Sequence, residues 1–402
     1  MKILMLGWEL PPHNSGGLGV ACYNMARALS REGAKIDFVL PYNAKHSEID
    51  FMEVHSATNL DPLFRFGGAY ESSRTSDPLI PNPTSEQMLS IREIQKEYCH
   101  FVQDLVADEK PDVVHAHDWL TYEAGIILKE KYGIPLIAHV HATEFDRSGG
   151  NTGNPLIHEI ESESLRAADK IIAVSELTKR IIHEKYGIPL QKIDVVYNSL
   201  DADYQDDDYE FEENCYQYAK AKKAAGYTIV STVGRFTIQK GLSFLMYAAK
   251  KALTKNPKLL FIFAGDGEER DKLIGLSADL GISENVIFTG FIRGTRLRDI
   301  YTISDIFVMS SISEPFGLTA LEAAYHGDAL ILTKESGVSE IIQSAFKYHF
   351  WDEDKLTSQI LALSSSSTLM STLKTNAKVE FMRISWDEIA KQCLEIYHLT
   401  KG

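Results

Sequence analysis

Two glutamates, Glu314 and Glu322, lie eight positions apart on either side of a turn that contains Gly317. The apolar run 305–309 before this turn is typical of a buried strand, and the residues after it are typical of a helix. A helix N-terminus at the end of a strand presents free N–H groups and a partial positive charge, which suits a phosphate. Carboxylates beside an anion site are costly unless they hold something else, and sugar or ribose hydroxyls are good candidates. The alternative is an ordinary strand–helix connection with one capping glutamate.

A second turn, residues 234–241, follows the predicted strand 228–233 and carries the cations Arg235 and Lys240. A guanidinium and an ammonium together can hold a pyrophosphate through forked and point-charge contacts. If the pyrophosphate is a leaving group, the pair also stabilises the charge that develops as the bond breaks. The alternative is a solvated basic turn.

Four histidines end two successive predicted strands, as the pairs His115 with His117 and His139 with His141. Side chains at i and i+2 share one face of a strand, so each pair could point the same way. Such a cluster could bind zinc. Core histidines that bond to neighbouring loops are commoner, and a third interpretation is that His141 and Asp118 contact a polar substrate.

Other motifs are weaker. The run Gly16-Gly17-Leu18-Gly19 opens a predicted helix, but it lies too far from the first strand for a dinucleotide fingerprint. It indicates either a loop that reaches toward a ligand or a plain helix entry. The Asp-x-Asp segments 206–208 and 352–354 do not follow predicted buried strands, so we interpret them as solvated charge rather than metal ligands. No nucleophile elbow, Walker loop or HExxH motif is present.

Composition limits the function classes. At 402 residues the chain exceeds one usual domain. A net charge of -15 argues against nucleic acid and against an anionic membrane surface. Four scattered cysteines without a CxxC pair favour reduced thiols and a cytoplasmic location. No apolar run is long enough for a membrane span, and the N-terminus lacks the pattern of a signal peptide.

Short apolar runs alternate with helical patterns along the whole chain, which predicts an α/β fold with parallel sheets. Predicted strands fall at 3–6, 36–40, 113–117, 136–140, 170–174, 194–197, 228–233, 259–264, 286–289, 306–309 and 329–333, and predicted helices at 17–32, 119–132, 155–168 and 176–186. The acidic stretch 201–226 is the best candidate linker, so we expect domains at 1–200 and 227–385. Residues 43–83 form a long irregular stretch, and 386–399 form an amphipathic helix. Two doubly wound domains that face each other would bind ligands at the carboxyl ends of their strands, in a cleft.

These motifs together resemble those of retaining glycosyltransferases of the GT-B fold, in the large fourth sequence family. The resemblance runs from Gly16 to the terminal helix, and it is strongest at the Glu314/Glu322 and Arg235/Lys240 pairs. Glycogen and starch synthases and sucrose-synthase-like enzymes are the most similar members. It implies two Rossmann-like domains that face each other across a cleft. The first, residues 1–200, would bind the acceptor, and the second, residues 227–385, would bind the nucleotide sugar. The terminal helix, residues 386–402, would cross back to the first domain.

The resemblance also implies roles for single residues. Gly16 and Gly17, with Arg235 and Lys240, would hold the diphosphate of the donor. The remaining expected site residues are His141 beside the donor sugar, Asp118 and Asn198 in the active centre, Glu314 near the sugar hydroxyls, the N–H groups of Phe316, Gly317, Leu318 and Thr319 at sugar and phosphate oxygens, and Glu322 at the ribose.

The implied reaction moves a hexose, above all glucose, from a UDP- or ADP-sugar to a sugar or α-glucan acceptor with retained configuration. The leaving phosphate would take the acceptor proton, so the reaction needs no metal and no cofactor. Asn14 stands where bacterial starch synthases carry a lysine, which counts against a strict ADP-glucose glycogen synthase. A nucleotide-sugar epimerase, a phosphorylase, a sucrose- or trehalose-type synthase and a non-catalytic sugar-binding partner are the alternatives. Neither the base, the acceptor nor the oligomeric state follows from the sequence.

Overall fold

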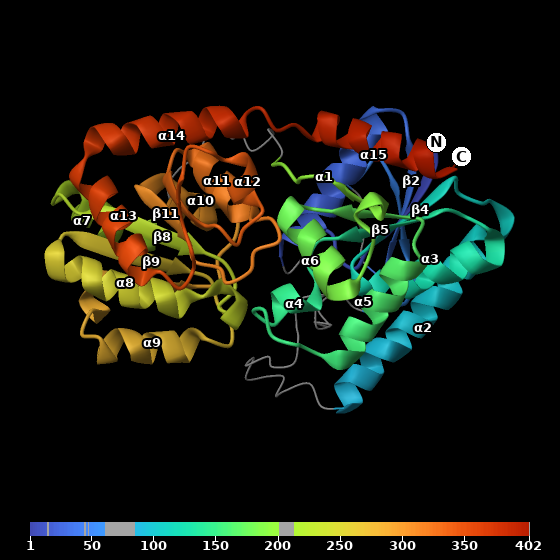
Figure 1. The fold of residues 1–402 in the computed structure, drawn as a ribbon, viewed down its shortest axis with the longest axis horizontal. Helices are drawn as coiled ribbons and strands as arrows, with labels where there is room; N and C mark the ends of the chain where they lie inside the picture. Colours follow the sequence, from blue (N-terminus) through green and yellow to red (C-terminus); the bar gives the residue numbers. More distant parts are fainter. Residues whose placement is uncertain (14–15, 44–45, 47, 61–84, 201–212, 402) are drawn as a thin grey trace. The chain divides into compact units, whose positions relative to one another are not determined.

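The computed structural model describes residues 1–13, 16–43, 46, 48–60, 85–200 and 213–401. The chain divides into two compact units, each built around a parallel sheet (Figure 1). Unit 1 comprises Met1–Ser199 with Ser385–Gly402, and unit 2 comprises Leu200–Ile384. The terminal helix therefore packs with the first half of the chain.

Unit 1 has a seven-stranded sheet in the order β3-β2-β1-β4-β5-β6-β7 within the described residues, with every neighbouring pair parallel. Its strands are β1 (Lys2–Leu6), β2 (Lys35–Leu40), β3 (Glu53–Ser56), β4 (Val113–His117), β5 (Leu136–Val140), β6 (Lys170–Ala173) and β7 (Ile193–Val195). Every residue of β4 and β5 is buried, as expected for strands covered on both faces.

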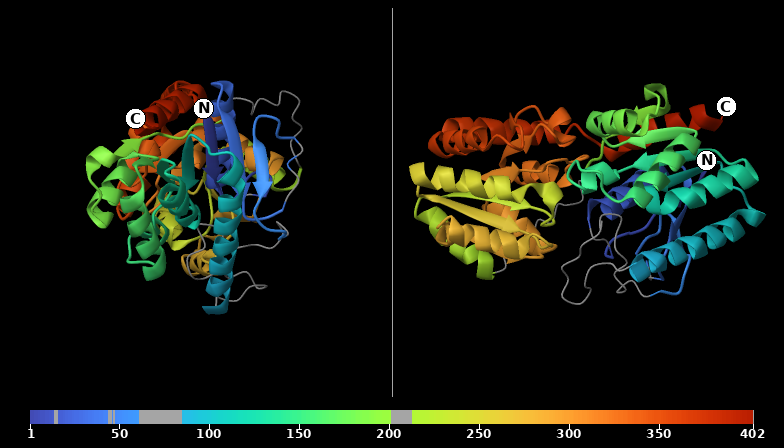
Figure 2. Two further views of the ribbon diagram at one scale, coloured as in Figure 1. Left: turned by 90° about the vertical axis from the view of Figure 1, so that its right-hand side faces the viewer. Right: turned by 60° about the horizontal axis from the view of Figure 1, so that its bottom comes forward.

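Helices cover both faces of this sheet (Figure 2). They are α1 (Gly17–Arg31), α2 (Ser85–Asp108), α3 (Trp119–Tyr132), α4 (Glu144–Arg147), α5 (Pro155–Ala167), α6 (Glu176–Tyr186) and α15 (Trp386–Lys401), with a 3-10 turn at Leu190–Lys192. Helix α15 packs against α1, while α3 packs against α2 and α5. The buried hydroxyl of Tyr98 in α2 donates to Gly7 O and Val39 O, which ties this helix to the sheet.

Unit 2 has a six-stranded parallel sheet in the order β10-β9-β8-β11-β12-β13 over its described part. Its strands are β8 (Thr228–Val233), β9 (Leu259–Ala264), β10 (Val286–Gly290), β11 (Ile306–Met309), β12 (Ala329–Thr333) and β13 (Phe346–Tyr348). Its helices are α7 (Glu213–Ala224), α8 (Leu242–Lys255), α9 (Arg270–Asp279), α10 (Thr295–Ile303), α11 (Leu318–His326), α12 (Val338–Ile341), α13 (Glu353–Ser365) and α14 (Ser367–Phe381), with 3-10 turns at Ile238–Lys240 and Ser283–Asn285. Its largest core cluster joins β8, β9, β11 and β12 to α8 and α13.

The structure differs from the sequence expectation in four places. Residues 213–224, expected in the acidic linker, form α7 and belong to unit 2. Helix α2 and strands β3 and β13 were not expected. Residues 201–212, with the acidic run 206–208, and most of the irregular stretch 43–83 lie outside the described residues.

The described helices include none that is long and apolar enough to cross a membrane. Cys22, Cys99 and Cys393 are free thiols, and burial raises the pKa of each.

Candidate functional site

Each sheet reverses its strand order once, between β1 and β4 in unit 1 and between β8 and β11 in unit 2. In open parallel sheets, ligands bind at the carboxyl ends of the strands beside such a reversal. Asp118 follows β4, Lys240 follows β8 and Glu314 follows β11. The predicted site residues thus lie at the strand ends where the topology favours binding.

In unit 2 the structure brings Lys240 and Glu314 together. Lys240 Nζ lies 2.5 Å from Glu314 Oε2, which also accepts a hydrogen bond of 2.8 Å from Ser311 Oγ. The side chains are 22% and 11% exposed, so solvent still reaches the ion pair. Both residues line an open pocket of about 250 Å³ at the reversal, together with Gly234, Ser310 and Thr319 among others. A cation and a carboxylate thus meet where a polar ligand could contact both.

The turns that carry this pair are held by backbone contacts. Gly241 follows Lys240 with φ 58°, and a Cβ there would lie 2.3 Å from Ser310 O, so only glycine fits. Gly317 opens α11 with φ 111°, and a Cβ there would lie 2.8 Å from Met309 Cε. The close approach of these turns to β11 brings the N-terminus of α11 to the pocket.

A second loop fixes the glutamate turn from the other side. Glu314 N donates to Glu335 O at 2.8 Å, Gly337 N donates to Glu314 O at 2.9 Å, and Val338 N donates to Phe316 O at 2.7 Å. These bonds satisfy backbone groups on both loops, so the turn from Glu314 to Gly317 has a defined shape before any ligand arrives.

Arg235 lies two residues beyond β8 and is partly exposed. The next residue, Phe236, is buried and anchors the loop, because its N–H donates to Asp266 O at 2.8 Å and its carbonyl accepts from Glu269 N at 2.9 Å. The loop after β9 therefore positions the arginine turn.

Glu322 lies one turn further along α11 and lines a different pocket, of about 310 Å³, with Arg298, Tyr325 and His326. Tyr301 in α10 donates its hydroxyl to Glu322 Oε2 at 2.6 Å. Burial raises the pKa of Glu322 to about 7, although the Tyr301 hydrogen bond acts in the opposite direction. The carboxylate is thus poised between its neutral and ionised forms near neutral pH.

In unit 1 the four predicted histidines form two hydrogen-bonded pairs across β4 and β5. His115 Nε2 lies 3.1 Å from His139 Nδ1, and His117 Nδ1 lies 3.0 Å from His141 Nε2. The rings of His115 and His117 in β4 are tilted with centroids 4.2 Å apart, and those of His139 in β5 and His141 just after it stack with centroids 4.1 Å apart. The sequence expectation that each pair shares a face agrees with this geometry. Tyr397 of α15 completes the array with a hydroxyl 2.7 Å from His115 Nδ1.

Asp118 has an unusual backbone. With φ 60° and ψ 171°, it is the non-glycine residue with positive φ among the described residues. Strained conformations of this kind persist where surrounding contacts impose them. Its Oδ1 accepts from His141 N at 2.7 Å and from Ala142 N at 3.4 Å, while Oδ2 is buried with no partner in the described structure. Burial raises the pKa of Asp118 to about 7, opposed by Arg147 and by the N–H bonds.

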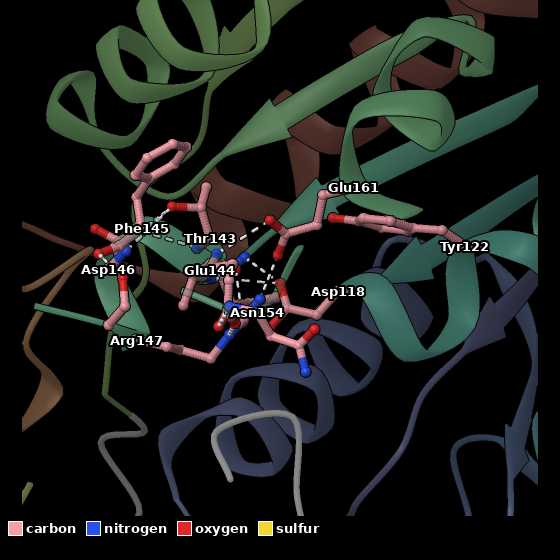
Figure 3. A network of polar contacts seen from close by, with 12 residues as sticks. Asp118, Tyr122, Thr143, Glu144, Phe145, Asp146, Arg147, Asn154 and Glu161 are labelled. Carbon is pink, nitrogen blue, oxygen red and sulfur yellow. Dashed lines mark hydrogen bonds and ion pairs between the residues drawn. The ribbon is translucent and has the colours of Figure 1, made fainter. Parts of the chain in front are cut away.

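A buried ionic network supports the loop after β5 (Figure 3). Arg147 forms ion pairs with Glu144, at 3.1 Å, and with Glu161, and it donates to Ala142 O at 2.9 Å. Glu161 also accepts from Glu144 N and from the hydroxyl of Tyr186. The two glutamates raise the pKa of Arg147 despite its burial, so the guanidinium keeps its charge, whereas burial raises the pKa of Glu161 although Arg147 acts in the opposite direction.

The helix N-terminus at Gly16 and Gly17 differs from the simple expectation. Gly16 caps α1 and Gly17 begins it, as predicted, but the carboxylate of buried Glu9 accepts from Gly19 N at 3.2 Å. A carboxylate thus already occupies part of this helix end. Asn198, after β7, is buried with an Oδ1 that has no partner within the described ranges.

Three groups among the described residues of unit 1 could hold a metal ion by proximity alone; one of them, Asp37 with Glu53 and His55, lies on β2 and β3, away from the histidine pairs, and two involve those pairs. The latter two are His115 with His117 and His139, and Cys22 with His117 and His141; the ligand atoms of each group lie within 4.8 Å of one another. Four of the ring nitrogens already bond to one another across the strands, so metal binding would have to break those bonds. Asp352, in the second acidic segment, caps α13, and Asp354 pairs with Lys251, as expected of solvated charge.

Sequence reasoning assigned no role to several residues that shape these sites. They are Glu9, Tyr301, Ser311, Arg147, Glu161 and Tyr397. Glu144 and Arg147 lie directly after the histidine motif, so their position was a usable signal. Each of the others makes a contact that no local sequence pattern predicts.

Comparisons with known proteins agree with this geometry. A family model described as Glycosyltransferase Family 4 matches residues 15–204, and one described as Glycosyl transferases group 1 matches residues 217–380. The chain belongs to glycosyltransferase family 4. It is a retaining glycosyltransferase that depends on a nucleotide-sugar donor.

Alignments with related protein sequences cover most of the chain. An uncharacterized glycosyltransferase of Methanocaldococcus jannaschii is 29% identical over 100% of this chain and 98% of its own length. A glycogen synthase of Mycobacterium tuberculosis is 28% identical over 85% of this chain and 80% of its own.

Solved structures confirm the predicted GT-B class of fold. Sucrose-phosphate synthase from Thermosynechococcus elongatus matches with a TM-score of 0.78 at 18% identity, covering 99% of this chain and 98% of that one. HepE of Anabaena in complex with UDP-glucose matches with a TM-score of 0.70 at 18% identity, covering 98% and 99%.

Proposed function

We propose that this enzyme transfers a hexose, most simply glucose, from UDP- or ADP-glucose to a sugar or α-glucan acceptor without a metal ion. The observation that carries the proposal is the contact between Lys240 and Glu314 in the pocket at the strand reversal of unit 2. A nucleotide sugar presents a diphosphate next to sugar hydroxyls, and this pair offers a cation next to a carboxylate.

In the proposed complex Arg235 and Lys240 hold the diphosphate. Glu314, freed from part of its contact with Lys240, accepts hydrogen bonds from the donor sugar. Glu322 accepts from the ribose hydroxyls. The backbone N–H groups of Phe316, Gly317, Leu318 and Thr319, at and before the start of α11, meet sugar and phosphate oxygens, since a helix N-terminus favours anions.

Unit 1 contributes buried hydrogen-bonding groups in this proposal. His141 lies beside the donor sugar, and Asp118 and Asn198 each keep a buried oxygen without a partner in the described residues. Buried acceptors of this kind cost free energy unless a ligand satisfies them. Gly16 and Gly17 approach the diphosphate through their backbone.

The proposed reaction proceeds by front-face attack. The bond between the sugar C1 and the phosphate oxygen breaks, and the acceptor oxygen forms a bond to C1 on the same face. The acceptor proton passes to the departing phosphate oxygen, so the products are the glycoside and a nucleoside diphosphate. Arg235 and Lys240 stabilise the negative charge that develops on the leaving group.

Two findings favour glucose over other sugars. One relative bears the name glycogen synthase, and one matching structure holds UDP-glucose. Because bacterial starch synthases carry a lysine at the position of Asn14, we place UDP-glucose beside ADP-glucose as a donor.

A panel of nucleotide sugars tests the proposal. The purified protein is incubated with UDP- and ADP-glucose and with other UDP-hexoses, in the presence and absence of glucan or sugar acceptors, and the product anomer is determined by NMR. Release of nucleoside diphosphate that rises with added acceptor and gives an α-linked product supports it. Release that does not depend on acceptor, or epimerisation of the donor, contradicts it.

A further inference from the structure

The hydrogen bond between His117 and His141 determines which nitrogen of His141 remains for a ligand. His141 Nε2 lies 3.0 Å from His117 Nδ1, so Nδ1 is the ring nitrogen that this bond leaves available. An imidazole that is neutral carries one proton, on either nitrogen, and the partner of one nitrogen therefore decides the role of the other. Burial lowers the pKa of His141 to about 3 and that of His117 well below its usual value, so both rings are neutral near pH 7.

Two arrangements of the protons satisfy this bond, and they differ at His117 Nε2. This atom is buried and has no hydrogen-bond partner among the described residues. If His141 donates from Nε2, then His117 must carry its proton on Nε2, as a buried N–H without an acceptor. If His117 donates from Nδ1, then its Nε2 is only an unused acceptor. Buried N–H groups without partners are the rarer and costlier case, so the second arrangement is favoured.

We propose that His117 is a positioning residue that fixes His141 in the tautomer with its proton on Nδ1, so that His141 offers substrate an N–H donor. This inference rests on the proposed place of His141 beside the donor sugar. A hydroxyl of the sugar would be the acceptor of this bond.

The surroundings keep the arrangement rigid. Both rings are almost fully buried, His139 stacks on His141 with centroids 4.1 Å apart, and the carbonyl of His117 accepts from Thr121 Oγ1 at 3.0 Å. The backbone N–H of His141 is held by Asp118 at 2.7 Å. His141 is thus restrained at its backbone, its ring face and one ring nitrogen, and only the proton position depends on His117.

NMR of the full chain reads the tautomer directly. Long-range proton–nitrogen correlations of protein labelled with [15N]histidine distinguish a proton on Nδ1 from one on Nε2, and the spectrum of His141→Gln identifies the signal. We expect His141 in the unsubstituted protein to carry its proton on Nδ1. A proton on Nε2 of His141 overturns the proposal, and this result does not depend on catalysis.

Kinetics test the consequence. The side-chain amide of His117→Asn can donate from the place of Nδ1, whereas His117→Phe keeps an aromatic ring and removes the donor. We expect His117→Phe to lower kcat about tenfold with little change in KM, and His117→Asn to stay within about threefold of the unsubstituted enzyme. His115→Phe is the matched control, because His115 belongs to the other histidine pair and is not bonded to His141. Thermal unfolding verifies that each variant is folded.

Equal losses in His117→Asn and His117→Phe would overturn the proposal, because they would show that the donor at Nδ1 does not matter. If no nucleotide sugar is turned over by the unsubstituted enzyme, the proposed function fails, while the NMR experiment still decides the tautomer.

Discussion

The carboxyl edges of the two sheets handle charge in different ways. In unit 1 the ion pairs of Arg147 with Glu144 and Glu161 are buried, with side chains at most 4% exposed. In unit 2 the pair of Lys240 and Glu314 is partly open to solvent. Removing one partner from a buried pair leaves an uncompensated charge, whereas an open pair can exchange its partners for a ligand. We infer that unit 1 provides a fixed frame and unit 2 an adaptable one.

The substitution with the largest expected effect tests whether the buried ionic network of unit 1 stabilises the fold. Arg147→Ala should lower the free energy of unfolding by about 3–5 kcal/mol, because it leaves two buried glutamates without a cation. Chemical denaturation measures the loss. Lys391→Ala, which removes an exposed pair with Glu388, is the control and should have no measurable effect. A small loss for Arg147→Ala would mean that the network is not a stabilising frame.

The second prediction concerns turnover and the cations of unit 2. Arg235→Ala should lower kcat by about 10²–10³, because the leaving group loses a charge that stabilises it. Steady-state kinetics with the preferred nucleotide sugar measure the change, and exposed Arg383→Ala is the control. A rise in KM with kcat intact would instead indicate uniform binding of substrate and transition state.

A smaller effect is expected from the pH dependence of nucleotide binding. The pKa of Glu322 is about 7, so affinity for nucleoside diphosphate should weaken as pH falls through 7 and the carboxylate takes up a proton. Tyr301 donates to the ionised form, so Tyr301→Phe should raise this pKa and move the midpoint up by about one pH unit.

Calorimetric titrations with UDP and ADP across pH 5.5–8.5, a range of about three units around this pKa, measure the midpoint. Tyr325→Phe changes another phenol in the same pocket and is the control. A midpoint that is the same in all three proteins would exclude Glu322 as the titrating group.

The last prediction is that removal of metal ions has no effect on activity. A chelator should leave activity unchanged, because the cations Arg235 and Lys240 serve the phosphate in place of a metal and the histidine nitrogens bond to one another. Activity before and after treatment with EDTA measures this. Complete loss that Zn²⁺ or Mn²⁺ restores would assign the histidine cluster to a metal and would make the two edges chemically alike.

Much of the fold could be predicted from local pattern. The strands 113–117, 136–140, 228–233, 259–264, 306–309 and 329–333 and the helices 119–132 and 176–186 have the same bounds in the structure. Strands that are buried on both faces are continuous apolar runs, so their limits are visible in one dimension. Helix α2 was missed because it follows a proline-rich stretch, and its contacts, such as Tyr98 with Gly7 and Val39, are distant in sequence.

The candidate site also contains residues that the sequence predicts and residues that it does not. The residues at strand ends, among them Asp118, Lys240 and Glu314, could be named from sequence, because the motif and the end of the strand lie side by side in the chain. Their partners could not be named. Tyr301 reaches Glu322 from another helix, and segment 213–224, expected in the linker, forms α7 and packs on β8 and α10.

By itself the sequence determined which segments are strands and helices, and which polar residues end them, because these properties depend on neighbours in the chain. Only the tertiary structure decided that His117 pairs with His141, that Arg147 meets Glu161, and that Tyr397 reaches His115 across 282 positions. The register of a parallel sheet and the return of a distant helix set these contacts. Neither leaves a signature in the local order of residues.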